Sequence, residues 1–186
     1  MIYYNAFAYS SIAEFAMPGD DLECVCDACA LGDWQYLDRT PIEVGLEPEG
    51  GLMFPDFIVY LDRVPLVSLK LRQALDEFGI DNLFYKPVSL VERDLGLREQ
   101  YWMALPPRID CLDWDECDLE EISPASFPGW VKTWKAKKIV VDPEKTGRYS
   151  IFKTPPNTAN QEIIVRRELK EFLEPFGFIN LNFYPL

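Results

Sequence analysis

The sequence contains no histidine among its 186 residues. Histidine is the side chain that most often serves as a general base near neutral pH, and it is a frequent zinc ligand. Its absence excludes Ser-His-Asp and Cys-His catalysis and every metal site that needs an imidazole. A glycine-rich phosphate loop is also absent, because Gly50-Gly51 matches no nucleotide-binding fingerprint. Carboxylates and cysteines are the side chains left for chemistry.

Positive charge is scarce as well. Lysine and arginine number 18 against 31 aspartates and glutamates, which gives a formal net charge of −13. Residues 1–62 hold 12 acids and only Arg39 as a base, so −11 of the total lies there. Basic residues outnumber acidic ones in residues 131–170. If this stretch lies away from the acids, it predicts a second face of opposite charge. The balance argues against nucleic acid or an anionic membrane as the partner and favours a basic protein.

Long apolar runs and a secretion signal are missing too. The first residues carry no basic region, and polar residues such as Asn5 and Glu14 interrupt the apolar stretch that ends at Met17. No apolar run approaches the roughly 20 residues that a membrane-spanning helix needs. The five cysteines are an odd number, which is typical of reduced thiols rather than of a disulfide framework. We therefore expect a cytoplasmic protein.

Two stretches of the sequence, residues 67–83 and 165–181, match each other with seven identities and no gap. In each stretch apolar residues recur at positions i, i+3, i+4 and i+7, which places them on one face of a helix. Gly79 and Gly177 follow the last apolar position, where a left-handed residue commonly ends a helix. Ser68 stands where it can cap the first helix. A short apolar run after each glycine predicts a strand.

These patterns predict an α+β fold with an internally repeated helix–glycine–strand unit. Further strands are predicted at residues 57–61, 139–141 and 150–152, and prolines and glycines mark the loops between them. We expect a single domain in two parts. An acidic, loop-rich N-terminal segment over residues 1–52 would pack on a core over residues 53–186.

A second acidic cluster contains no base between residues 110 and 121. Its members are Asp110, Asp113, Asp115, Glu116, Asp118, Glu120 and Glu121. In a strand, the spacing of two would place Asp113 and Asp115 on one face, where they could hold a hard cation. We favour a solvated or partner-binding face, because runs of charge usually face solvent. Trp114 stands among these acids, and tryptophan is enriched in binding hot spots, so we expect this segment to contact the partner.

The cysteines raise the alternative of a metal site. They are Cys24, Cys26, Cys29, Cys111 and Cys117. Four thiolates could bind a structural zinc ion tetrahedrally. Only Cys26 and Cys29 have the C-x2-C spacing of a zinc knuckle, however, and a zinc ribbon usually has two such knuckles. We therefore favour free thiols and no cofactor, with structural zinc as the alternative.

Several short motifs resemble those of bacterial immunity proteins from polymorphic toxin systems. The matching residues are Asp56 or Asp62, Leu66-Val67-Ser68, Gly79-Ile80, Phe84 to Val88, Tyr101, Asp113-Trp114, Asp142 with Lys145, and Gly177 to Phe183. The resemblance covers about residues 53–186. It departs at Cys117, where a serine is expected. Most motif residues are packing positions, so the resemblance carries over no catalytic residue.

The resemblance implies a non-catalytic immunity protein that binds and neutralises a cognate toxin. Many toxins act on nucleic acids and are basic, which suits an acidic partner that associates by electrostatic steering. Two alternatives come from other classes. An acidic adaptor or regulatory protein would bind some other basic protein, and a carboxylate- or metal-dependent hydrolase would use Asp113, Asp115 and Asp118. The hydrolase is the weaker alternative, because the side chains available for general acid–base catalysis are few.

Overall fold

The computed structural model describes residues 3–8, 14–19, 40–47, 50–60, 64–123, 133–155, 157–158 and 162–186. The structure is mostly β-sheet, with 47% of the described residues in strands and 14% in helices. The expected α+β fold class with a repeated helix–glycine–strand unit is therefore wrong. The sequence shows helical periodicity only in the two short stretches that form helices. The other elements of the described structure are strands, nearly all of them antiparallel.

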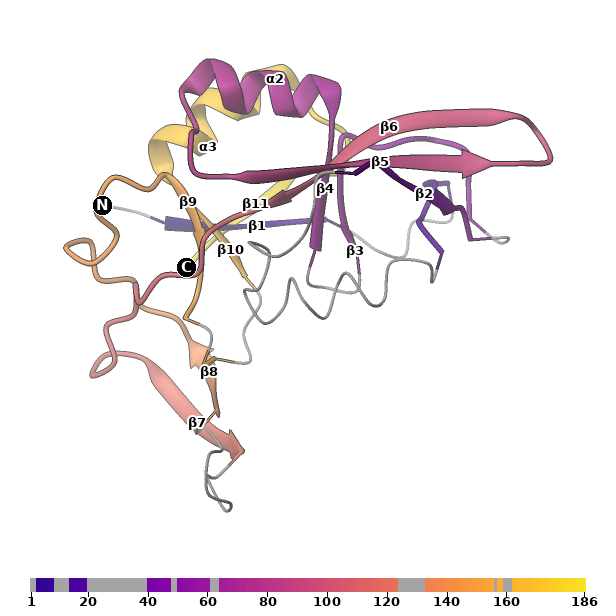
Figure 1. Cartoon of the computed structure of the whole chain (residues 1–186). Helices are drawn as coiled ribbons and strands as arrows, with labels where there is room; N and C mark the ends of the chain where they lie inside the picture. The colour runs from indigo at the N-terminus through magenta and orange to yellow at the C-terminus, as the bar shows by residue number, and fades with distance from the viewer. Residues whose placement is uncertain are drawn as a thin grey trace.

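One sheet has five strands in the order β2-β5-β6-β4-β3. Their bounds are β2 (Ile42–Gly45), β3 (Phe57–Tyr60), β4 (Val64–Ser68), β5 (Phe84–Glu92) and β6 (Leu97–Leu105). β5 and β6 form a long antiparallel hairpin, and β2 pairs parallel with the outer half of β5. The far end of this hairpin extends beyond the rest of the molecule (Figure 1).

The second sheet is antiparallel and has four strands in the order β11-β1-β10-β9. Their bounds are β1 (Tyr3–Phe7), β9 (Ile151–Lys153), β10 (Ile163–Arg166) and β11 (Asn182–Pro185). β1 lies between β10 and β11, so residues from the two ends of the chain complete one sheet. The division of the chain at residue 52 stays a prediction, because residues 20–39 lie outside the described part.

Two short helices, α2 (Leu69–Phe78) and α3 (Arg167–Leu173), lie side by side over the sheets (Figure 1). A 3-10 turn, η3 (Glu174–Phe176), extends α3. The Ser68 Oγ accepts a hydrogen bond from the Leu71 N–H at 3.2 Å, which confirms the predicted cap. Gly79 and Gly177 both adopt the left-handed conformation, with φ of 91° and 60°, as predicted. None of the described helices is long and apolar enough to span a bilayer.

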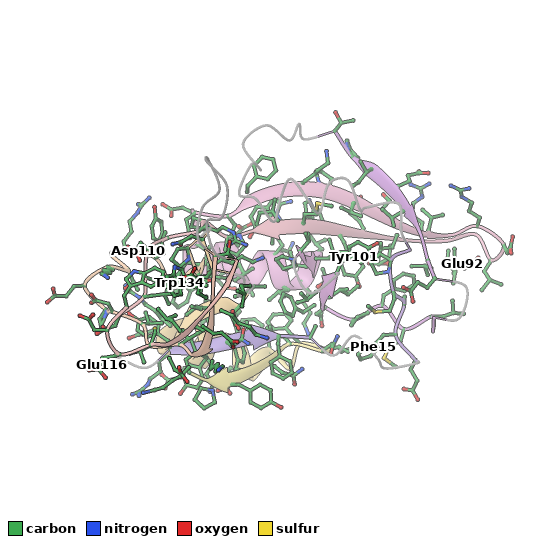
Figure 2. The ribbon with its side chains drawn as sticks, turned by 90° about the horizontal axis from the view of Figure 1, so that it is seen from below. Phe15, Glu92, Tyr101, Asp110, Glu116 and Trp134 are labelled. Atoms are coloured by element: carbon green, nitrogen blue, oxygen red, sulfur yellow. The ribbon has the colours of Figure 1, made fainter. Side chains whose placement is uncertain are left out.

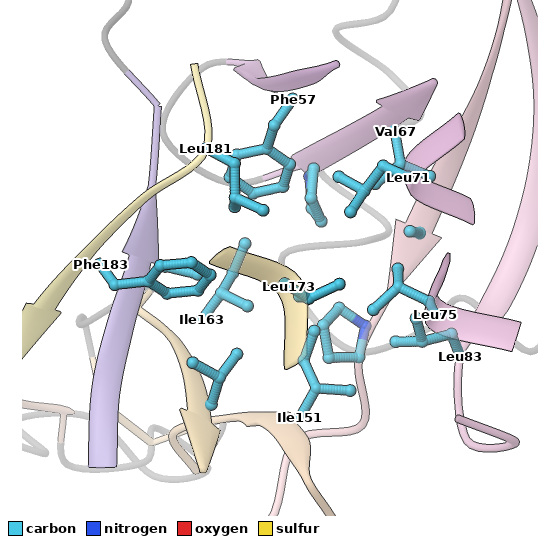
Figure 3. A pocket seen from close by; sticks show the side chains of 15 residues that line it. Phe57, Val67, Leu71, Leu75, Leu83, Ile151, Ile163, Leu173, Leu181 and Phe183 are labelled. Atoms are coloured by element: carbon cyan, nitrogen blue, oxygen red, sulfur yellow. The ribbon is translucent and has the colours of Figure 1, made fainter. Parts of the chain in front are cut away.

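The main hydrophobic cluster lies between the helices and the two sheets. It combines Leu71 and Leu75 of α2 with Leu169 and Leu173 of α3 and with inward residues of both sheets. Figure 3 shows a cavity of about 30 Å³ at its centre, lined only by apolar side chains and proline rings. This volume is close to that of one water molecule, and the lining offers water no polar partner. The cavity is too small to be a substrate site.

Two further clusters lie on the outer faces of the sheets. On the five-stranded sheet, fully buried Tyr101 is at the centre, and its hydroxyl donates to the Pro55 carbonyl. Burial raises the pKa of Tyr101 above its usual value. On the four-stranded sheet, Phe152 and Ile164 pack against Cys111 and Leu112. That last contact fixes the start of the acidic segment to the body of the protein.

A separate two-stranded sheet contains the end of the acidic segment. β7 (Asp118–Ser123) and β8 (Thr133–Lys138) pair antiparallel, and together they project away from the body as an arm (Figure 1). The strand predicted at residues 139–141 is wrong, because β8 ends before it and only Val141 makes an isolated bridge. The strands predicted at 57–61 and 150–152 correspond to β3 and β9 within one residue.

Candidate partner-binding site

The acidic segment over residues 110–121 begins at a firmly held base. The Asp113 N–H donates to the Val140 carbonyl at 2.9 Å, and the Asp142 N–H donates to the Cys111 carbonyl at 2.8 Å. Cys111 and Leu112, between these bonds, are fully buried. The base of the arm is thus a short antiparallel contact whose side chains belong to the hydrophobic core.

A tight turn at residues 114–116 leads from this base into β7. The Asp113 Oδ1 accepts hydrogen bonds from the N–H groups of Asp115 and Glu116, both at 3.2 Å. The Cys117 N–H donates to the Asp113 carbonyl at 3.0 Å. An aspartate that bonds the backbone two and three residues ahead stabilises a turn. The placement of Asp113 and Asp115 on one face of a strand is therefore wrong, because they lie in a turn.

Trp114 holds this turn against the body. Its indole Nε1 donates to the Asp110 Oδ1 at 2.9 Å, and its ring packs against the cluster around Cys111 and Leu112. The side chain is half-buried. Tryptophan combines a large apolar surface with one hydrogen-bond donor, and here both are used within the chain. The structure thus brings Asp110, Asp113 and Trp114 together as a support for the turn.

The remaining acids of the segment are presented to solvent. Asp115, Glu116, Asp118 and Glu120 are exposed, and Glu121 is half-buried. Figure 2 shows Asp110 and Glu116 at one end of the molecule, with Trp134 of β8 beside them and Glu92 at the opposite end. The exposed carboxylates of the turn are therefore free of the fold's main packing contacts and face outward from a fixed base.

Lysines of β8 lie directly beside the acids of β7. The register pairs Asp118 with Lys138 and Glu120 with Lys135, and the Lys137 Nζ is 3.3 Å from the Glu120 Oε2. The lysines of β8 thus share one arm with the acids of β7, so this part of the basic stretch does not lie away from the acids and forms no separate face of opposite charge. Cross-strand pairing brought them together, which the order of charges along the chain does not show. Exposed ion pairs of this kind add little stability.

A lysine on the next turn holds the acidic segment from the other side. The Lys145 Nζ donates to the Leu112 carbonyl at 2.7 Å and lies 4.0 Å from the Asp142 Oδ2. The Asp142 Oδ1 accepts the N–H of Glu144 at 2.9 Å, which stabilises the turn that carries the lysine. The sequence motif of Asp142 and Lys145 was visible, but only the structure shows that it positions the acidic segment.

Two of the five cysteines can be placed. Cys111 and Cys117 are free thiols, and burial raises the pKa of Cys111 to about 12. The Cys117 Sγ accepts the Val140 N–H at 3.2 Å. Cys24, Cys26 and Cys29 lie outside the described residues. Within the described part of the chain, no three acidic, cysteine or histidine side chains gather to hold a metal ion. A zinc ion bound through the N-terminal cysteines stays a prediction.

Asp56 is a buried carboxylate whose role sequence reasoning missed. Its Oδ1 accepts the Ser68 hydroxyl at 2.6 Å, and its Oδ2 accepts the Ile179 N–H at 2.9 Å. The Lys70 Nζ lies 3.9 Å from the same Oδ2. One side chain therefore joins β3, the start of α2 and the segment before β11. The family-like motif left this aspartate and Asp62 as alternatives, and Asp62 lies outside the described residues.

Of the residues that resemble an immunity protein, Asp113, Trp114, Asp142 and Lys145 hold the acidic segment in place. A family model for the Imm11 immunity protein family matches residues 27–186. The chain belongs to this family. The predicted resemblance to immunity proteins is confirmed. The Imm11 match includes Cys29, Cys111 and Cys117 and begins after Cys24 and Cys26. No curated protein matches the chain.

Proposed function

We propose that this Imm11 family member binds a cognate toxin in the cytoplasm and neutralises it without catalysing a reaction. The observation that carries the proposal is the family match over residues 27–186, since the family is one of immunity proteins. The acidic segment adds support, because its exposed carboxylates suit a basic protein surface. The excess of acids over the whole chain argues against nucleic acid or an anionic membrane as the direct partner.

The geometry of the segment suits recognition of a protein. Asp113, Trp114 and Lys145 fix the turn through hydrogen bonds, so Asp115 and Glu116 are held in place before any partner arrives. A surface that is already ordered loses less conformational entropy when it binds. The exposed carboxylates of this turn also attract a basic partner from a distance and so raise the association rate.

A hydrolase that uses Asp113, Asp115 and Asp118 is less consistent with these contacts. The Asp113 Oδ1 accepts two backbone N–H groups, so this carboxylate already has a structural role in the turn. Asp118 lies in β7, across from Lys138. An adaptor that binds another basic protein would use the same exposed acids, and only the identity of the partner distinguishes it from an immunity protein.

Co-expression with the product of the adjoining gene tests the proposal. We expect the host cells to survive the neighbouring toxin and the two proteins to purify as a complex. In that complex, the double variant Asp115→Asn with Glu116→Gln should bind about tenfold more weakly, because it removes exposed charge but no turn hydrogen bond. Glu77→Gln with Glu171→Gln is the matched control, since these exposed acids lie on the helices.

The outcomes separate the candidate functions. Survival with a stable complex supports immunity by binding. Survival without a complex would indicate an enzyme that acts on the product or target of the toxin. If the cells do not survive and no complex forms, the proposed function is overturned. If the complex forms but the Asp115 and Glu116 variant binds as tightly as the wild type, toxin binding stands and its placement on this turn is wrong.

A further inference from the structure

The turn at the far end of the β5–β6 hairpin carries a leucine that the fold does not explain. Leu95 stands in the four-residue turn between Glu92 and Leu97, and 60% of its surface is exposed. Turns of this kind favour glycine, asparagine, aspartate and serine, and Gly96 supplies the positive φ of 65° here. Leu95 therefore serves neither turn formation nor burial in the core.

Other exposed apolar side chains lie at the same end of the molecule. Leu97 is 38% exposed, Leu52 50% and Met53 45%. Single exposed hydrophobic residues are normal on protein surfaces, so Leu95 alone would need no explanation. A group of four large apolar side chains at one end of the described structure does need one. We call this end, residues 14–17, 46–47, 50–53 and 91–99, the distal end.

Backbone hydrogen bonds join the segments of the distal end side by side. The Met53 N–H donates to the Glu14 carbonyl, the Glu47 N–H to Met17 and the Leu46 N–H to Val91, at 3.0, 2.9 and 3.2 Å. Glu92 then pairs with Leu97 across the hairpin. Four steps of about 4.8 Å between adjacent segments give a width of about 19 Å. This width lies within the footprint of a standard protein interface, about 800 Å² per partner.

Acids surround the apolar side chains of the distal end. Glu14, Glu47, Asp94 and Glu99 are all exposed, and they outnumber the two arginines of the hairpin, Arg93 and Arg98. Arg98 is also paired with Glu43 of β2. Apolar side chains at the centre with a charged rim are the usual anatomy of a protein interface. The sign of the rim is the same as that of the turn at residues 114–116.

We infer that the distal end is a second docking surface, which takes a basic and partly apolar surface of the toxin. This inference rests on the proposed function and adds to it a contact site far from the arm. Figure 2 places Glu92 at the opposite end of the molecule from Glu116, so the two sites can be altered independently. The apolar side chains supply affinity by burial, and the acidic rim supplies the attraction for basic groups.

The test compares variants of the full chain by their affinity for the toxin encoded by the adjoining gene. The double variant Leu95→Ser with Leu97→Ser should bind about tenfold more weakly or worse, with an unchanged unfolding midpoint. Leu69→Ser is the matched control, because Leu69 is also 50% exposed but lies on α2. A second variant, Asp94→Lys, should mainly slow association, and Glu77→Lys on α2 is its control.

Each result either supports or overturns the inference. Weaker binding by the Leu95 and Leu97 variant alone supports it. Wild-type affinity in that variant and in Asp94→Lys overturns the second surface while toxin binding stands. An equal loss in Leu69→Ser also overturns it, because the effect would then not be specific to the distal end. If the wild-type protein itself fails to bind the toxin, the proposed function fails, and this inference fails with it.

Discussion

At the scale of single residues, the structure separates side chains that hold the fold from side chains that are exposed to solvent. Trp114 and Asp113 were expected at the interface because of their types, yet both are engaged within the chain. In the hydrogen bonds that hold this turn, Asp115 and Glu116 take part only through their backbone N–H groups. The sequence could not show which of these four residues hold the fold and which are exposed, because that depends on where the turn packs.

Asp56 is a buried polar residue whose substitution should lower the stability of the fold. Asp56→Ala removes the acceptors of the Ser68 hydroxyl and the Ile179 N–H, and it leaves both groups without their partner. Since hydrogen bonds to a charged group contribute about 1.5–3 kcal/mol each, we expect the free energy of unfolding to fall by about 2–4 kcal/mol. Urea unfolding monitored by fluorescence measures this change.

The matched control for Asp56 is Asp81→Ala. Asp81 is an exposed carboxylate that pairs with Arg148 at 3.2 Å, and an exposed ion pair contributes less than about 1 kcal/mol. Ser68→Ala should have an intermediate effect, because it removes one of the Asp56 hydrogen bonds and the cap of α2. Wild-type stability in Asp56→Ala would contradict the role that we assign to this carboxylate.

At the scale of elements, the short helices were easier to predict than the strands. Apolar spacing, the Ser68 cap and Gly79 defined α2 closely, because each of these signals is local. The apolar run after Gly79 predicted the start of β5, but the rest of β5 and the whole of β6 gave no such signal. Val88 and Leu90 face the cluster around Tyr101, while Tyr85 and Pro87 lie on the side that α2 covers. A strand that is covered on both faces lacks the alternation of apolar and polar residues by which strands are recognised.

The side chains of helix α2 should contribute to stability mainly through its buried face. Leu75 is 3% exposed and lines the cavity of about 30 Å³ between the sheets. Leu75→Ala enlarges that void, so we expect the free energy of unfolding to fall by about 2–5 kcal/mol. Leu69→Ala in the same helix should change it by less than about 0.5 kcal/mol, because Leu69 is 50% exposed. Equal effects of the two substitutions, measured by thermal or urea unfolding, would contradict this packing.

At the scale of the whole molecule, charge dominates what the protein can bind. The formal net charge is −13, and the exposed acids at the turn and at the distal end lie on surfaces that the fold leaves open. The lysines of β8 offset only the acids of β7, which lie beside them. The protein therefore presents negative potential at both ends, and it should attract basic proteins over distances longer than a direct contact.

Salt should consequently slow toxin binding. The Debye length falls from about 30 Å at 0.01 M ionic strength to about 8 Å at 0.15 M, which screens the attraction between the two proteins. We expect the association rate constant to fall over this range, with little change in the dissociation rate constant. Stopped-flow measurements at several salt concentrations check this. The Asp115→Asn, Glu116→Gln variant should show a weaker salt dependence, and an association rate independent of salt would contradict electrostatic steering.

The sequence by itself determined the properties that depend on residue type or on neighbours along the chain. It determined the negative charge, the absence of histidine chemistry, the cap at Ser68, the left-handed glycines and the family motifs. Tertiary structure decided the rest. It placed β1 between β10 and β11, set the lysines of β8 beside the acids of β7, and turned Trp114 inward. These arrangements join residues that are distant in the sequence, and strand pairing over such distances leaves no local pattern to read.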